Sequence, residues 1–189
     1  MKLVNNRISA FTALGLVTLA LPPAIGAQVA ELAVRSTAFE ENQAIPLRNS
    51  AYGDNLSPEI TWSGVPAGTA TFALVLTDPD VPMPDGFVHW VIYNIPGTAN
   101  GLPEGIPSET ATLAEPAGTT QGLMGMRRPG YFGPRPPAGG GVHHYVFHVY
   151  ALDSDLQLAE GLSREDLMSA IEGHIVGEGR VTGIFEREE

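Results

Sequence analysis

The amino-acid sequence predicts a mostly β domain, a sandwich or a barrel, with one short helix near its C-terminus. Of the 189 residues, 22 are glycine and 16 are proline, a composition that favours short strands joined by shaped turns over a helical bundle. Short apolar runs recur between these turn residues, as they do in all-β folds, over residues 32–39, 60–62, 72–77, 87–95 and 145–152. The length is that of one domain.

The first 27 residues predict a secretory signal peptide. Lys2 and Arg7 give a positively charged start, residues 8–21 carry no charge, and two prolines then precede small residues. This order is typical of the leader of an exported chain. The uncharged stretch is short for a membrane-spanning helix, which needs about 20 apolar residues, and a retained membrane anchor is the alternative interpretation.

Cleavage after Gly26 or Ala27 would follow from this leader. We therefore expect a periplasmic or secreted protein with no membrane span after processing. Residues 28–38 would form an N-terminal extension, and the folded domain would occupy residues 39–189.

Two of the predicted strands alternate clearly enough for their faces to be assigned, because side chains at i and i+2 share one face of a strand. In the run 87–95 this rule puts His89 and Trp90 on opposite faces. In residues 143–152 it puts His143 on the same face as Tyr145. His144 and His148 share the other face, but about 13 Å apart, too far to bind one metal ion.

The remaining elements are a long loop, a helix and a last strand. Residues 97–141 are rich in Gly and Pro, and a loop of this length in a compact domain is usually functional or mobile. Ser163 and Asp166 form a capping box that begins a helix, whose apolar stripe continues to Ile175 before Gly177 ends it. Residues 181–185 are then a short final strand.

Composition excludes several classes of protein. The formal net charge is −11, from 21 acidic and 10 basic residues, and Lys2 is the only lysine, so no nucleic-acid partner is expected. The absence of cysteine excludes a disulfide scaffold and thiol catalysis. Removal of residues 1–27 would leave eight arginines against the 21 acidic residues, a net charge of −13.

Polar residues beside the predicted strands are the candidates for chemistry. Asp78 and Asp80 follow a strand and are held by neighbouring prolines, although an acidic turn is the simpler interpretation. His89 lies in mid-strand, where a histidine is more often a core residue, and His143 with Tyr145 forms a second polar pair. The Gly- and Pro-rich residues 130–141 could present backbone N–H groups to an anion, or could be an exposed loop.

Three motifs in a fixed order give the sequence a family resemblance. They are LTDPDVP at 76–82, HW at 89–90 leading into NIP at 94–96, and GYFGPRPP at 130–137 leading into HHYVF at 143–147. Together they resemble the phosphatidylethanolamine-binding protein family, in its bacterial Raf-kinase-inhibitor-like branch. SPEITWSGVP at 57–66 agrees as well, and the likeness covers residues 39–187.

The resemblance implies a Greek-key antiparallel β-sandwich with a small pocket for phosphate-type anions or phospholipid head groups, and two-fold association. The family's pocket positions correspond here to Asp78, Asp80, His89, Gly133, Pro137, His143 and Tyr145. Two positions depart from the family pattern: Arg135 stands where members carry a small residue or Cys, and residues 122–126 lack a common Asn. An Arg135 folded inward would add a forked contact to phosphate.

The two aspartates would repel an anion unless cationic groups lie between. A carboxylate favours the charged form of a neighbouring imidazole, so a protonated His89 or His143, with backbone N–H groups of residues 133–137, would donate to the anion. Binding should then weaken as the pH rises through the histidine range, near about 6.5.

Binding is favoured over catalysis, because no nucleophile with an adjacent base is visible, and neither a cofactor nor a resident metal is expected. One alternative is a protease inhibitor or a protein-interaction module. The other is a metal-dependent or acid/base hydrolase that uses Asp78, Asp80, His89 and His143.

Overall fold

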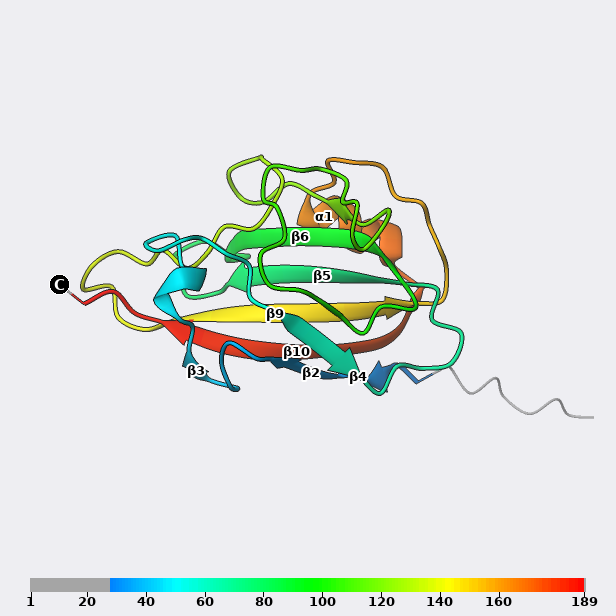
Figure 1. Ribbon diagram of the computed structural model, residues 1–189, viewed down its shortest axis with the longest axis horizontal. Coiled ribbons are helices and arrows are strands. Elements are labelled where there is room, and N and C mark those ends of the chain that lie inside the picture. Colours follow the sequence, from blue (N-terminus) through cyan, green and yellow to red (C-terminus); the bar gives the residue numbers. More distant parts are fainter. Residues whose placement is uncertain (1–27, 189) are drawn as a thin grey trace, which may run out of the picture.

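The computed structural model describes residues 28–188, which fold into two packed β-sheets with one helix (Figure 1). The main sheet has seven strands, and its four long ones run in the spatial order β10–β9–β5–β6, each antiparallel to its neighbour. Their bounds are β5 Thr71–Asp78, β6 Phe87–Pro96, β9 His143–Leu152 and β10 Ile175–Phe185.

Short strands border the main sheet and form the second one. In the main sheet, β1 (Ala30–Glu31) and β3 (Gln43–Ala44) pair in parallel with β10, and β8 (Thr120–Gln121) pairs with β6. The second sheet consists of β2 (Ala33–Ser36), β4 (Ile60–Ser63) and β7 (Gly101–Leu102). A 3₁₀ turn, η1 (Leu47–Asn49), and the helix α1 (Arg164–Ile171) complete the fold.

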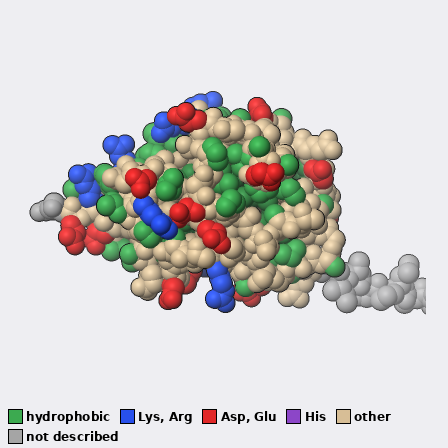
Figure 2. Space-filling view, viewed as in Figure 1, with side chains coloured by type: hydrophobic (Ala, Val, Ile, Leu, Met, Phe, Trp, Pro, Cys, Tyr) green, Lys and Arg blue, Asp and Glu red, His purple; other side chains and the backbone are tan. Residues whose placement is uncertain are grey.

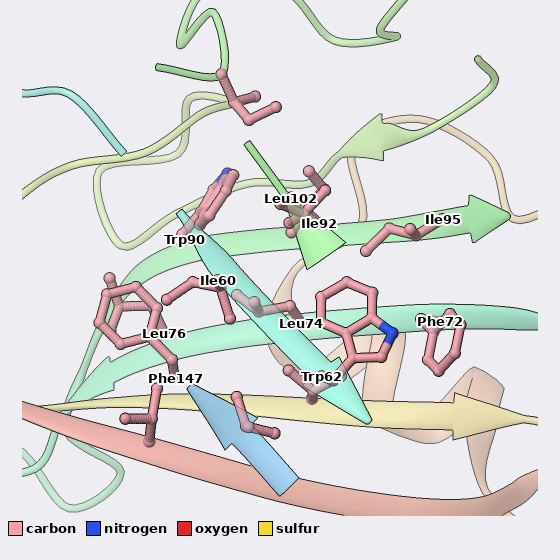
Figure 3. Packing of buried hydrophobic residues seen from close by; sticks show 14 of the residues in the cluster. Ile60, Trp62, Phe72, Leu74, Leu76, Trp90, Ile92, Ile95, Leu102 and Phe147 are labelled. Atoms are coloured by element: carbon pink, nitrogen blue, oxygen red, sulfur yellow. The ribbon is translucent and has the colours of Figure 1, made fainter. Parts of the chain in front are cut away.

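The predicted mostly β sandwich with a small C-terminal helix is confirmed. The space between the sheets is filled by apolar side chains, with Ile60 and Trp62 of β4 facing Phe72 and Leu74 of β5 (Figure 3). A second cluster packs Leu167 and other α1 residues against the outer face of the main sheet. Both faces of the main sheet are therefore covered, which explains its almost uninterrupted burial.

The boundary between helix and last strand differs from the prediction. The helix has the predicted capping box at Ser163, but it ends at Ile171, and Gly173 at a φ of 80° turns the chain away. Ile175 is the first residue of β10 and pairs with Leu152, so the last strand begins six residues earlier than residue 181. Gly177, predicted to end the helix, lies within β10, as does Gly179, which packs against Leu32 where a Cβ would have no room.

Strand β6 contains a bulge that changes which face His89 occupies. Leu76 of β5 pairs with Trp90, but Thr77 pairs with Val88, so His89 is an extra residue without a partner. The prediction that His89 and Trp90 lie on opposite faces is therefore wrong. Trp90 belongs to the core between the sheets, and the ring of His89 lies 5.1 Å from that of Tyr145 in the same core.

The N-terminal segment joins both sheets. Within the predicted extension 28–38, residues pair with β10 and β4, and Leu32 and Val34 are buried in the core. The predicted signal peptide, residues 1–27, lies outside the described residues. Among residues 28–188, no helix is both long and apolar enough to cross a membrane.

Candidate functional site

Three strand ends bring the candidate residues together at one end of the main sheet. The last residue of β5, Asp78, pairs with the first of β6, and β9 begins beside them, on the left in Figure 1. This arrangement places Asp78, His89, His143 and Tyr145 next to one another, and we call these four residues the polar cluster. All are buried, with exposed fractions between 0% and 8%.

Asp78 and His143 form the centre of the cluster. Asp78 Oδ2 accepts a hydrogen bond from His143 Nδ1 at 2.7 Å, and its Oδ1 accepts one from the Asp80 backbone N–H at 2.9 Å. Both carboxylate oxygens thus have a partner, and the aspartate orients the imidazole through one ring nitrogen. The Nε2 atom of His143 is left for another group.

Asp80 lies at the rim and not within the cluster. Its Oδ2 accepts hydrogen bonds from the backbone N–H of His144 at 2.6 Å and from His144 Nδ1 at 2.9 Å. Partial burial opposes ionisation, but these donors hold the pKa of Asp80 below its usual value. The two aspartates are therefore fixed to two consecutive histidines that face opposite ways.

His89 is enclosed by aromatic rings. Its imidazole stacks on Phe132 at 5.6 Å between ring centroids and meets the edges of Phe87 at 4.8 Å and Tyr145 at 5.1 Å. Burial lowers the pKa of His89 to about 4, although hydrogen bonding to the Phe132 carbonyl and the charge of Asp78 oppose the shift. His89 is therefore neutral near pH 7, so of the two histidines that the sequence offers as a protonated donor, His89 does not supply the charge.

Tyr145 carries a hydroxyl with unused hydrogen-bonding capacity. The side chain is fully buried, and within residues 28–188 its hydroxyl makes no hydrogen bond, although the Asp78 carboxylate and the Arg135 backbone lie near it. Burial, and then the nearby charge of Asp78, raise the pKa of Tyr145 above its usual range, so the hydroxyl keeps its proton. It can donate to an anion that enters the cluster.

The Gly/Pro loop forms one wall of the site in a different way from the one predicted. Gly133 N–H donates to Asn55 Oδ1 at 2.8 Å, so it is not free to bind an anion. A Cβ at Gly133 would lie 2.8 Å from the carbonyl carbon of Ser50, so this glycine allows two backbone segments to pack closely. The side chains of Arg135 and Pro137 are exposed, and Arg135 is not folded inward.

Sequence reasoning missed two contributors to this wall. Phe132 accepts a hydrogen bond from His89 Nδ1 on its carbonyl at 2.6 Å, and its own N–H donates to the His89 carbonyl at 3.0 Å. Asn55, at a φ of 55°, holds the loop through Gly133. An aromatic residue in a Gly/Pro loop could have drawn attention to Phe132, but nothing in the sequence around Asn55 indicates its role.

The geometry gives no sign of a metal centre in the part of the chain that the structure describes. No group of three or more His, Asp or Glu side chains among these residues lies close enough to hold an ion. Each carboxylate of the site is instead paired with a separate histidine. What the polar cluster offers is a proton donor at Tyr145, an oriented imidazole at His143 and a neutral imidazole at His89.

Comparison with known proteins gives a consistent result. A family model described as phosphatidylethanolamine-binding protein matches residues 35–186. A UPF0098 protein of Methanothermobacter thermautotrophicus is 42% identical over 154 residues, which cover 82% of this chain and 98% of that protein. The mycobacterial protein named "Putative lipoprotein LppC", from Mycobacterium tuberculosis, is 39% identical over 156 residues, 82% of this chain and 72% of the relative.

Two solved structures have the same fold. Escherichia coli YbcL, described as a new member of the mammalian PEBP family, superposes with a TM-score of 0.77 and 30% identity, over 84% of this chain and 100% of that one. A homologue of the phosphatidylethanolamine-binding protein from Chlamydia trachomatis gives a TM-score of 0.74 and 33% identity, over 84% and 99% of the two chains.

Proposed function

The chain belongs to the phosphatidylethanolamine-binding protein family, and on that premise we propose that it binds small phosphate-type anions or phospholipid head groups at the polar cluster. The function is binding, with Asp78, His89, His143 and Tyr145 as the residues that meet the ligand. Asp80, Gly133, Arg135 and Pro137 belong to the surrounding wall and rim.

The observation that carries this proposal is the buried Tyr145 hydroxyl without a partner. Leaving a buried polar group unsatisfied costs about 1–3 kcal/mol, so such groups are rare unless a function needs them. A ligand oxygen at this position would remove that cost. The hydroxyl is fixed on a central strand, so the binding geometry exists before the ligand arrives.

His143 supplies the charge in this proposal. Its Nδ1–H is bound to Asp78, so in the imidazolium form its Nε2–H is directed to a ligand, while the aspartate balances the added charge. We expect affinity for phosphoethanolamine to fall when this donor is removed.

Isothermal titration of phosphoethanolamine at several pH values tests the proposal. His143→Gln should weaken binding at about pH 6 by tenfold or more, since a charge-assisted hydrogen bond is lost. His174→Gln is the matched control, because His174 is partly exposed and pairs with Asp153 at the opposite end of β9. Absence of binding by the unmodified protein, or equal binding by both variants, would sink the proposal.

We also propose that the protein is exported by residues 1–27. A basic start followed by an uncharged stretch supports this, and a relative carries a lipoprotein name. The chain has no cysteine for lipid attachment, so the processed protein would not be lipid-anchored in that way. N-terminal sequencing of the protein recovered outside the cytoplasm would check the cleavage site, and a chain still beginning at Met1 there would contradict it.

A further inference from the structure

His89 has a fixed tautomer. Its Nδ1 lies 2.6 Å from the Phe132 carbonyl oxygen, which can only accept, so Nδ1 must carry a proton. The N–H of Phe132 donates back to the His89 carbonyl at 3.0 Å, so this pair of bonds fixes the ring against the Gly/Pro loop. Among residues 28–188 the only hydrogen bond of the ring is the one made by Nδ1, although the Gly133 carbonyl also lies close enough to the ring to affect its pKa.

The surroundings of His89 keep Nε2 unprotonated. The groups that act on the ring are Asp78 from β5, His143 and Tyr145 from β9, and the carbonyls of Phe132 and Gly133 in the loop. Desolvation outweighs the attraction of Asp78, and the proximity of His143 adds to the effect, so the pKa of His89 falls to about 4. At neutral pH Nε2 therefore carries a lone pair and no proton, so it can only accept a hydrogen bond.

The polar cluster thus contains an acceptor beside its donors. Tyr145 O–H and the imidazolium form of His143 can donate to an oxyanion, but His89 Nε2 would face the same ligand with a lone pair. An oxygen that carries no proton would be repelled there, and it would offer the nitrogen no hydrogen bond. An oxygen that brings a proton would satisfy it.

We infer that the site selects oxyanions that carry their own acidic proton, so that a phosphate or a phosphomonoester with a P–OH group binds in preference to sulfate, a fully ionised monoester or a phosphodiester. This inference rests on the proposed function and names its ligand class. The protonated oxygen donates to His89 Nε2, and the remaining oxygens accept from Tyr145 and His143. A site that hydrogen-bonds a particular O–H or N–H group of its ligand discriminates strongly against analogues that lack that group.

Three probes separate the ligand classes. Inorganic phosphate, sulfate and glycerophosphoethanolamine should be titrated into the full chain at about pH 6, at equal ionic strength. Phosphate should bind at least about tenfold more tightly than either of the others, because only phosphate keeps a P–OH group there. Equal affinities would overturn the inference alone, whereas no binding of any probe would overturn the proposed function as well.

The pH dependence separates the ligand's proton from that of the protein. A phosphomonoester such as phosphoethanolamine loses its last acidic proton with a second pKa of about 6, whereas inorganic phosphate still carries one proton at pH 8. From about pH 6 to 8, the affinity for phosphoethanolamine should fall several-fold more than that for phosphate. A change of charge on the protein would weaken both alike, so an unchanged ratio of the two affinities would contradict the inference.

A substitution at His89 gives an independent test. In His89→Gln the side-chain amide can turn its N–H toward the ligand, so the preference for phosphate over sulfate should shrink from tenfold or more toward one. His174→Gln, the distant exposed control, should keep the full preference. If folded His89→Gln keeps the preference for phosphate over sulfate, other groups set the selectivity and the proposed role of Nε2 is overturned. If this variant does not fold, the titrations of the unmodified protein with the three probes still test the inference.

Discussion

Substitution of Tyr145 should have opposite effects on stability and on ligand affinity. Its buried hydroxyl has no partner within residues 28–188, so Tyr145→Phe removes an unsatisfied group without leaving another. We expect the ligand-free protein to gain about 1 kcal/mol in free energy of unfolding, measured by urea denaturation. Affinity for phosphoethanolamine should fall about tenfold, since the donor to the ligand is lost.

Tyr93 provides the matched control for that substitution. It is equally buried on β6, but its hydroxyl donates to the Ala159 carbonyl at 2.7 Å and accepts from the Leu162 N–H at 3.3 Å. Tyr93→Phe should therefore lower the free energy of unfolding by about 1 kcal/mol and leave the affinity unchanged. If Tyr145→Phe destabilises the protein as much as Tyr93→Phe does, the hydroxyl of Tyr145 has a partner in solution.

His89 should make the fold sensitive to acid. Its pKa is about 4 in the folded protein and near 6.5 in an unfolded chain, so between these values the unfolded state binds more protons. The contribution of His89 to the free energy of unfolding is therefore fully present above about pH 6.5. It is lost as the pH falls toward 4, by up to about 3 kcal/mol.

Urea denaturation at several pH values checks this prediction. His89→Gln should lose distinctly less stability than the unmodified protein between pH 6.5 and 4, although His148, whose burial also lowers its pKa, contributes in the same direction in both. His174→Gln should behave as the unmodified protein does. Parallel pH profiles for the unmodified protein and His89→Gln would show that the pKa of His89 is not lowered in the folded protein.

At the scale of elements, the Gly/Pro loop positions the site through one glycine. Gly133 lies against the backbone of residues 49–51, with a Cβ position 2.9 Å from the Ala51 nitrogen. Gly133→Ala must move the loop and with it Phe132, whose two hydrogen bonds hold His89. We expect a loss of about 1–3 kcal/mol in stability and a loss of tenfold or more in affinity for phosphoethanolamine.

Gly161 provides the control for the loop prediction. It has a φ of 80° and no atom within 4 Å of its Cβ position, so Gly161→Ala introduces backbone strain without a clash. That variant should lose about 1 kcal/mol, by thermal or urea denaturation, and should bind phosphoethanolamine as the unmodified protein does. Unchanged affinity in Gly133→Ala would mean that the loop does not set the geometry of His89.

The central strands could be predicted from alternation and spacing, but the bulge in β6 could not. A bulge depends on how two strands align, and the run 87–95 alternates well enough by itself to conceal it. Its effect is that His89 and Trp90 both face the core. Sequence motifs therefore predicted His89 as a site residue without indicating its low pKa, because burial at this position follows from the pairing register and not from the local sequence.

At the scale of the whole molecule, the fold class followed from features distributed over the chain. Turn residues and apolar runs fix the number and spacing of strands, whichever residues fill the loops. The end of the helix and the start of β10 could not be assigned in this way, because Gly179 and Gly183 serve the close approach of Leu32 and Ile45 from the N-terminal segment. Such contacts join residues more than a hundred positions apart.

The overall charge gives a last prediction about binding. The processed chain would carry eight arginines against 21 acidic residues, and Figure 2 shows acidic side chains interspersed with the basic ones over the face in view. An anion would therefore approach a molecule of the same sign, and under the proposed function only short-range donors in the polar cluster would hold it. Long-range repulsion weakens as the Debye length shrinks from about 30 Å at 0.01 M salt to about 10 Å at 0.1 M.

Affinity for phosphoethanolamine should consequently rise several-fold as sodium chloride increases from about 10 to 100 mM, which is the opposite of the behaviour of a basic anion-binding surface. Titration calorimetry at constant pH measures this directly. The His143→Gln variant, which removes the ring donor but hardly alters the total charge, should show the same upward trend from a weaker starting affinity. A decrease with salt would mean that local positive charge, such as that of Arg135 at the rim, outweighs the charge of the whole molecule.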